Sequence, residues 1–290
     1  MSSVPLATPV GAIGEVLPLK KPVVPVSGRY KAMAQAAARR KRLQALLPWV
    51  VTLAALILWE LACRAFTIPQ FVLPPPSAVA ASMVKWWSPL MSNAAQTLMT
   101  TLAGFAIAVV VGLLMGVALG SSSMVYHGLY PLMIAFESVP KVAIVPILVL
   151  WFGIGTVPAI LTSFLIAFFP IAVNVSTGIA TVEPELRDVL RALGARPLDI
   201  VKKIGIPRAM PYFFASLKIA ITFAFVGSIV SETVGANNGI GHLIMLASSR
   251  FDVPLVFSGL VVTSVMGVSM YVLARIVETR VTGWATRGRT

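Results

Sequence analysis

The chain has 290 residues, of which 58% are hydrophobic and only 11% are charged, and its mean hydropathy is +0.90. These values exclude a soluble globular domain, which must cover itself with polar side chains, and indicate an integral membrane protein. The net charge of +13 does not indicate nucleic-acid binding, because the basic residues gather beside apolar segments, as orientation signals do. We therefore expect membrane lipid, and no nucleic acid, among the partners.

Six apolar segments are long enough to cross a bilayer, since about 30 Å of hydrocarbon requires about 20 apolar residues in a helix. They are Leu43–Cys63, Thr97–Gly120, Val125–Trp151, Val157–Ala180, Tyr212–Val234 and Pro254–Val277. Backbone groups in lipid must satisfy their own hydrogen bonds, and the alternating pattern of a β-barrel is not present, so the spans are helices. The predicted fold is all-α, a polytopic membrane protein with about six transmembrane helices.

Basic residues are distributed unevenly between the two sides that six spans create. The side that holds both termini also holds the N-terminal basic run and a charged loop, whereas the other side holds only Arg64, Lys85 and Arg250. By the positive-inside rule, both termini are predicted to be cytoplasmic. Residues 1–42 are expected to form a disordered basic tail, 43–63 a first transmembrane helix that is retained, and 278–290 a second cytoplasmic tail.

Residues 64–96, between the first two spans, are expected to form an extracytoplasmic loop. The consecutive prolines Pro74 to Pro76 predict a stiff turn. A short helix is expected to begin at Ser77 and to carry Trp86 and Trp87 to the membrane interface.

The second span carries Gly112, Gly116 and Gly120 at a spacing of four residues. This small-residue pattern lets two helix backbones approach closely. The pattern is compatible with helix packing within one chain and with an interface between two copies of the chain.

The third span contains Pro131, Pro140 and Pro146, so we expect a kinked or broken helix that partly lines an aqueous cavity. Glu137 and Lys141 lie four residues apart, which places them on one helical face. Lys141 would suit an anionic solute in a translocation path, or it would neutralise Glu137.

Polar side chains inside the membrane are costly and are expected to face the bundle interior or an aqueous path. The candidate residues of a translocation path are Glu137, Lys141, Asn174, Ser176 and Glu232. For Glu232 two roles are open, a part in gating or a structural contact that holds the turn from Gly235 to Gly241.

The segment Glu183–Arg208, between the fourth and fifth spans, holds ten charged residues and must lie in water. We call it the charged segment. Pro184 predicts a helix start, and Leu186, Val189, Leu190 and Leu193 predict an apolar stripe. Gly194 is expected to end this helix, Pro197 to start a second turn, and Pro207 to close the unit before the fifth span. Such a short helix needs a partner for its stripe, unless it lies on lipid headgroups.

Within the charged segment, Asp188-Val189-Leu190 is followed after three residues by Gly194, and after nine more by Ile204-Gly205-Ile206-Pro207. This spacing resembles the cytoplasmic "EAA" loop of permease subunits in bacterial ATP-binding cassette (ABC) importers. The family consensus is Glu-Ala-Ala, three residues, Gly, nine residues, Ile, one residue, Leu-Pro. The opening triplet departs from it, with Asp for Glu and Val-Leu for Ala-Ala.

Other stretches resemble the nitrate/sulfonate/taurine branch of that family. They are Leu73 to Ser77, Pro140 to Pro146, Trp151 to Gly155, Phe168 to Pro170 and Gly235 to Gly241. Together they cover roughly Phe71 to Val277.

The resemblance implies a type I importer in the bacterial inner membrane. Its partners would be ATPase subunits, an extracytoplasmic substrate-binding protein and a second permease chain, as a homodimer. The core permease domain would comprise residues 97–277, including a cytoplasmic coupling loop at 182–210, and the helix Glu185–Leu193 would act as the lever that seats in the ATPase. The implied ATPase-coupling residues are Arg187, Asp188, Leu190, Arg191, Leu193, Gly194, Ile204 and Pro207.

The sequence contains no glycine-rich phosphate loop with Lys and Ser or Thr, so this chain is not expected to bind ATP or to be an enzyme. ATP and Mg²⁺ would be bound by the partner ATPase, and we expect no catalytic residues, cofactor or metal here. The implied solute is a nitrate, sulfonate or taurine-like anion, or a pyrimidine precursor of thiamine. The alternatives are a secondary transporter or channel that works without an ATPase, and a scaffold that recruits a cytoplasmic partner.

Overall fold

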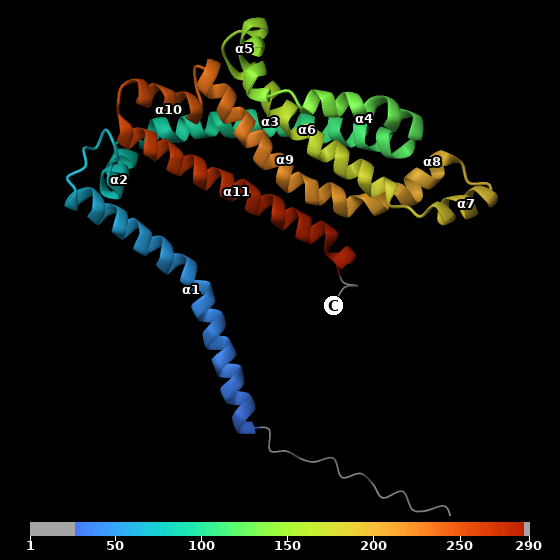
Figure 1. Ribbon diagram of the computed structural model, residues 1–290, viewed down its shortest axis with the longest axis horizontal. Coiled ribbons are helices and arrows are strands. Elements are labelled where there is room, and N and C mark those ends of the chain that lie inside the picture. The colour runs from blue at the N-terminus through green and yellow to red at the C-terminus, as the bar shows by residue number, and fades with distance from the viewer. Residues whose placement is uncertain (1–26, 287–290) are drawn as a thin grey trace, which may run out of the picture. The chain divides into compact units, whose positions relative to one another are not determined.

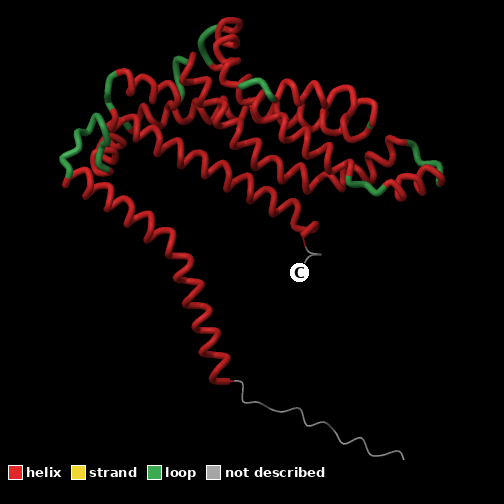
Figure 2. Tube along the Cα trace, viewed as in Figure 1, coloured by secondary structure: helices red, strands yellow, loops and turns green. Residues whose placement is uncertain are grey.

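The computed structural model describes residues 27–286, and Figure 2 shows that this part of the chain consists of helices joined by loops, without a strand. The chain divides into two compact units, Met1–Ile57 and Leu58–Thr290, and the packing described below is that of the second unit. The elements are α1 (Ser27–Ala65), α2 (Pro76–Lys85), α3 (Trp87–Ser121), α4 (Ser123–Glu137), α5 (Lys141–Phe152), α6 (Thr156–Ala180), α7 (Pro184–Ala192), α8 (Pro197–Ile200), the π-helical turn η1 (Val201–Gly205), α9 (Ile206–Gly235), α10 (Ile240–Ser249) and α11 (Val253–Thr286).

Five helical stretches of the described residues are long and apolar enough to cross a membrane. They are Leu46–Ala65, Trp87–Ser121, Thr156–Ala180, Pro197–Gly235 and Val253–Val281, and α4 with α5 adds a sixth if this bent pair is one span. The predicted all-α fold with about six spans is confirmed.

Three helix ends extend nine or more residues beyond the predicted spans. α1 begins at Ser27 and α11 continues to Thr286, so residues 27–42 and 278–286, which we assigned to tails, are helical. The Ala, Arg, Lys and Gln residues of 32–42 are strong helix formers, a preference that charge counting overlooks. α3 begins at Trp87 instead of Thr97, and Pro89 is tolerated because it lies in the first helical turn. Residues 1–26 and 287–290 of the predicted tails lie outside the described residues.

The glycine stripe of α3 packs against α6 within the same chain. A Cβ atom added at Gly112 would lie 2.9 Å from the Phe168 carbonyl oxygen, and one added at Gly116 would lie 2.7 Å from that of Ala172. Real Cβ atoms do not fit at such distances, so glycine is what allows the two backbones to touch. Of the two interpretations of the stripe, the structure supports intrachain packing.

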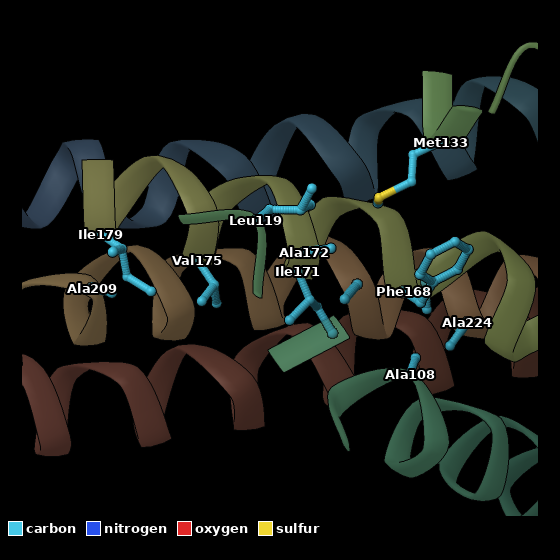
Figure 3. Close-up of a cluster of buried hydrophobic side chains, with 12 residues drawn as sticks. Ala108, Leu119, Met133, Phe168, Ile171, Ala172, Val175, Ile179, Ala209 and Ala224 are labelled. Carbon is cyan, nitrogen blue, oxygen red and sulfur yellow. The ribbon is translucent and has the colours of Figure 1, made fainter. Parts of the chain in front are cut away.

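α3, α6 and α9 run side by side, with α11 along α9 (Figure 1). Figure 3 shows the buried apolar side chains of this bundle, half of which come from α6. The buried cluster comprises Ala108, Leu119, Met133, Ala167, Phe168, Ile171, Ala172, Val175, Ile179, Ala209, Ala220 and Ala224. Its many alanines and β-branched residues explain how three helices approach closely along their lengths.

The third predicted span is two helices, and α5 is bent by 88° relative to α4. The break lies at Ser138, Val139 and Pro140, where Pro140 precedes α5 with an extended backbone. A proline cannot supply the next helical N–H and disfavours the helical conformation for the residue before it. The predicted interruption is therefore confirmed, but Glu137 and Lys141 lie on two helices and not on one helical face.

α2 is capped by a side chain from α1. Its own N-cap residue, Pro75, makes no side-chain cap, and Glu60 Oε2 accepts the Ser77 backbone N–H at 3.0 Å while Oε1 accepts the Ser77 hydroxyl at 2.8 Å. A carboxylate at a helix N-terminus is favourable because the free N–H groups carry partial positive charge. The short helix predicted from Ser77 thus starts at Pro76 and is fixed to the end of α1.

Candidate functional site

α7, the amphipathic helix of the charged segment, is bounded by residues with special backbone properties. Pro184 occupies the first helical turn, where its missing N–H costs no hydrogen bond. Gly194 has a φ of +85°, and the N–H groups of Gly194 and Ala195 donate to the carbonyl oxygens of Arg191 and Leu190. This is the Schellman arrangement, in which a glycine in the left-handed region ends a helix and reverses the chain. The predicted start, stop and second turn are where the sequence placed them.

Two arginines fix the charged segment to the end of α6. Arg187 Nη2 donates to the Ile179 carbonyl oxygen at 3.0 Å, and Arg208 Nη1 donates to the Thr181 carbonyl oxygen at 3.3 Å and pairs with Glu183 at 2.6 Å. The last carbonyl groups of a helix lack intrahelical partners and attract cations. The hydrogen bond from Arg208 also holds the pKa of the Glu183 carboxyl below its ordinary value. Since both partners are solvent-exposed, this contact is weak.

The charged segment also exposes three large apolar side chains beside its charged ones. The side chains of Val189, Leu193 and Leu198 are 56%, 78% and 68% exposed. Leu190 is half-buried and lines a hollow with Ile204, between α7 and the turn that follows it. The predicted stripe is therefore covered unequally, since Leu190 is half-buried whereas Leu193, which lines the same hollow, remains 78% exposed.

The residues of α7 that were predicted to make polar contacts with the ATPase differ in their exposure. Asp188 and Arg191 are exposed and lie 3.4 Å apart, a loose pair that can exchange partners. Arg187, by contrast, is half-buried and directed at the carboxyl end of α6, as described above. Its role as an ATPase contact stays a prediction, and in this structure it anchors the lever to the bundle.

α8, η1 and α9 form one continuous helical run, so the prediction that Pro207 closes the unit before the fifth span is wrong. The N–H of Ile206 donates to the carbonyl of Val201, five residues back, and Pro207 then falls in the first turn of α9. The wider π turn accommodates a proline that lacks an N–H and whose ring would clash in a regular α turn. The charged segment is thereby joined rigidly to α9, and Ile204 and Pro207 lie within the joint.

Among the candidate path residues, Glu137 and Lys141 pair across the break between α4 and α5. Lys141 Nζ lies 2.8 Å from Glu137 Oε2, and the Lys141 side chain is only 9% exposed. The lysine also approaches the ring of Phe136, with 5.8 Å between Nζ and the ring centroid. Of the two roles that the sequence left open for Lys141, neutralisation of Glu137 is what the structure shows.

Asn174 and Ser176 of α6 lie within the helix bundle. Asn174 Nδ2 donates to the Pro170 carbonyl oxygen one turn earlier, at 2.8 Å, so its carboxamide is bonded within α6. Ser176 is buried, and its carbonyl oxygen faces Gly120 in the contact between α3 and α6. Their place in a path stays a prediction.

Glu232, at the far end of α9 from the charged segment, is 2% exposed and surrounded by donors. Its Oε2 accepts from the Thr97 hydroxyl at 2.8 Å and from the Gly241 N–H at 3.0 Å, and its Oε1 accepts from Ser228 and Thr100 at 3.3 and 3.4 Å. We call Asn93, Thr97, Thr100, Ser228 and Glu232 the carboxylate cluster. A buried carboxylate is tolerable only with several such donors.

The carboxylate cluster caps α10 from other helices. The first three N–H groups of this end, those of Gly239, Ile240 and Gly241, donate to Asn93 Oδ1 at 2.7 Å, Thr97 Oγ1 at 2.9 Å and Glu232. The N-terminal N–H groups of a helix have no intrahelical acceptor, so these three bonds fix both its position and its direction. The structure therefore supports the structural role for Glu232, which holds the turn before α10.

The other members of the carboxylate cluster were not predicted from the sequence. Asn93, Thr97 and Thr100 recur at helical spacing on one face of α3, which is a detectable signal. Their partner Glu232 is 135 positions from Thr97 along the chain, and spacing cannot indicate such a pairing.

Beside this cluster, the turn before α10 borders a small polar pocket, which we call the amide pocket. It is lined by Gln96, Thr100, Gly155, Thr156, Ala159, Glu232, Ala236, Asn237 and Asn238. The Gly155 N–H donates to the Gly235 carbonyl oxygen at 3.2 Å, so the loop between α5 and α6 is tied to the same turn.

Comparison with known proteins identifies the family to which the chain belongs. A family model described as "Binding-protein-dependent transport system inner membrane component" matches residues 108–283, more than half of the chain. This chain belongs to that family. It is a type I ABC importer permease, and the charged segment and the turn before α10 both lie within the matched range.

Three relatives illustrate the range of the family. The permease is 28% identical over 246 residues to "Formylaminopyrimidine transport permease protein ThiX" of Halalkalibacterium halodurans, which covers 84% of this chain and 98% of the relative. It is 30% identical to "Riboflavin transport system permease protein RibX" of Chloroflexus aurantiacus, over 81% and 88% of the two chains. It is 27% identical to "Taurine transport system permease protein TauC" of Escherichia coli, over 80% and 88%. The predicted sulfonate/taurine-like branch is confirmed.

Solved structures confirm the fold. The inward-facing MetNI methionine ABC transporter aligns with a TM-score of 0.60 and 22% identity, over 68% of this permease and 98% of that chain. An amino acid ABC transporter aligns with a TM-score of 0.57 and 18% identity, over 69% and 97%.

Proposed function

We propose that this permease moves a small solute across the bacterial inner membrane. The transport is driven by separate ATPase subunits that bind the charged segment. ATP and Mg²⁺ are bound by those subunits and not by this chain. An extracytoplasmic binding protein delivers the solute, and two copies of the permease form the pore as a homodimer. Both termini and α7 lie on the cytoplasmic side, and α10 lies on the extracytoplasmic side.

One observation carries this proposal, namely the exposed apolar face of α7 at the end of a rigid connection to α9. Val189 and Leu193 are open to solvent, and burial of such side chains by a partner is favourable by about 25 cal/mol per Å² of apolar surface. An amphipathic helix of nine residues is marginal by itself and is suited to a hydrophobic groove on a partner. A displacement of α7 is transmitted to α9 through the helical run that starts at Pro197.

The two anchors of the charged segment suit this role. Arg187 and Arg208 bind the carboxyl end of α6, so α7 is connected to α6 as well as to α9. α6 and α9 share the core with α3, and a displacement of α7 is therefore applied to the bundle and not to a loose loop.

The solute belongs to the range that the relatives transport by name, which includes formylaminopyrimidine, riboflavin, aliphatic sulfonates and taurine. Calorimetric titration of the cognate binding protein with formylaminopyrimidine, riboflavin, taurine and nitrate would identify the class. Binding of one compound and not the others is the expected result.

The proposal is tested by affinity purification and by energy depletion. Tagged permease should bring down an ATPase subunit, and uptake should stop when ATP is depleted while the ion gradient is maintained. A photocrosslinker at Leu193 should label that ATPase, whereas the same group at Val265, exposed on the apolar helix α11, should label lipid. Uptake that persists without ATP, together with lipid labelling from Leu193, would show a transporter that works without an ATPase.

A further inference from the structure

The amide pocket at the α10 end is built for hydrogen bonding. Gln96, Asn237 and Asn238 contribute carboxamides, each with two N–H donors and a carbonyl acceptor, and Thr100 and Thr156 contribute hydroxyl groups. The lining contains no Lys, Arg or His side chain. Nothing in the pocket therefore matches the charge of an anion, whereas a neutral group with donors and acceptors finds partners.

Glu232 forms part of the pocket wall, but its oxygen atoms are already occupied. Oε2 accepts from Thr97 and Gly241, and Oε1 accepts from Thr100 and Ser228. The carboxylate is also nearly inaccessible, with 2% of the residue exposed. Glu232 is thus suited to hold the pocket in shape and not to contact a passing molecule.

The turn that carries Asn237 and Asn238 is fixed at both ends. On one side the Gly235 carbonyl accepts the Gly155 N–H, and on the other Gly239 donates to Asn93. Gly239 has a φ of +111°, and a Cβ atom there would lie 2.2 Å from the Glu232 carboxyl carbon. Because the exposed carboxamides sit at the tip of a turn with fixed ends, their arrangement is set by the cluster beneath them.

We propose that Gln96, Asn237 and Asn238 form a contact site for the imported solute, which takes an uncharged polar group that presents both donors and acceptors, as an aminopyrimidine ring does. Glu232 is the positioning residue of this site and acts through the turn. The inference rests on the proposed function and adds the solute class to it. Within the range of named relatives, it favours a neutral nitrogen heterocycle over a sulfonate.

The site is tested in proteoliposomes that contain the whole transporter, with its binding protein, using labelled formylaminopyrimidine and labelled taurine. The double variant Asn237→Leu/Asn238→Leu should lower formylaminopyrimidine import per ATP hydrolysed about tenfold, as expected for the loss of one or two hydrogen bonds. Gln96→Leu, on α3 and outside the turn, should lower it about threefold. Gln70→Leu, an exposed carboxamide that does not line the pocket, is the matched control and should import as the wild type does.

Two variants test the positioning role of Glu232. In Glu232→Gln, the amide oxygen can still accept from Gly241 and Thr97, and the amide nitrogen can donate to the hydroxyl oxygens of Thr100 and Ser228. Import per ATP should therefore stay within about threefold of the wild type. Glu232→Ala removes all four bonds and should match the double asparagine variant. If Glu232→Gln is as impaired as Glu232→Ala, the charge itself is required and the positioning role is wrong.

The outcomes separate this inference from the proposed function. Normal formylaminopyrimidine import by both the double asparagine variant and Gln96→Leu would overturn the contact site. Wild-type import of taurine and not of formylaminopyrimidine would overturn the solute class. ATP-independent import by the wild-type assembly would instead contradict the proposed function, and no variant is needed to see it.

Discussion

The two ends of the helical run Pro197–Gly235 are built in opposite ways. At the α7 end, the contacts are arginine hydrogen bonds to carbonyl groups at the end of α6, and apolar side chains are exposed. At the α10 end, a buried carboxylate and two side chains of α3 satisfy three consecutive N–H groups. This difference indicates that the α7 end is arranged to bind other molecules, whereas the α10 end is held in one conformation. Substitutions should therefore affect stability at the α10 end and coupling at the α7 end.

The largest expected effect is that of Gly239→Ala. The new Cβ would overlap the Glu232 carboxyl group, and the φ of +111° disfavours any residue with a side chain. We expect a loss of about 3 kcal/mol or more of folding free energy, from backbone strain and overpacking together. The amount of monodisperse protein that survives heating in detergent measures it. Gly128→Ala, in α4 with open space around it, is the control and should behave as the wild type does; equal survival of the two variants would contradict the rigid α10 end.

Gly194→Val should come next, with its effect on coupling and not on insertion. There is space for the side chain, but the φ of +85° costs a β-branched residue about 1 to 3 kcal/mol, so the chain reversal after α7 shifts. We expect normal expression, and ATP hydrolysis that no longer drives uptake. The ratio of solute imported to ATP hydrolysed in proteoliposomes measures this, with Gly128→Val as a matched control. A ratio equal to that of the wild type would show that the left-handed turn is dispensable.

Leu193→Asp should weaken ATPase binding without unfolding the permease. The side chain is 78% exposed, so the fold loses little, whereas a groove that buries the leucine would have to bury a charge. We expect at least a tenfold loss of ATPase recovered with the tagged permease, at unchanged thermal stability. Leu150→Asp, equally exposed but on α5, should retain the ATPase if it inserts normally.

The smallest expected effect is that of acid on the pair of Glu183 and Arg208. Because the pKa of Glu183 is lowered in the folded protein, its contribution to stability is present above the ordinary value and is lost as pH falls through the lowered pKa. Proteolysis between α6 and α7 should therefore become slightly faster in the acid range. Glu183→Gln should remove this pH dependence, and an unchanged dependence in that variant would assign it to another group.

The sequence predicted the α7 end more completely than the α10 end, for a physical reason. Pro184, Gly194 and Pro197 determine the backbone within a few residues of themselves, so the limits of α7 follow from local rules. The same rules wrongly predicted a helix boundary at Pro207, because a π turn accommodates a proline that would clash in a regular α turn. They also missed the helix of residues 27–42, where helix propensity outweighs charge.

The carboxylate cluster could be predicted only in part. Glu232 stood out as a costly group in a membrane span, and a role in holding the turn was one of two options. Which option holds depends on Thr97, Thr100 and Asn93, which reach it only when α3 and α9 pack together. The glycine stripe of α3 indicated a close contact but not that α6 was the partner, because spacing in one helix does not name the other.

The length of the helical run from Pro197 has a mechanical consequence. At 1.5 Å per residue, its 39 residues extend about 58 Å, roughly twice the thickness of the hydrocarbon layer. If such a rod pivots about one extremity by about 10°, the opposite extremity sweeps about 10 Å, by the same rise per residue. A modest rotation at one extremity would thus produce, at the other, a displacement the size of a small solute.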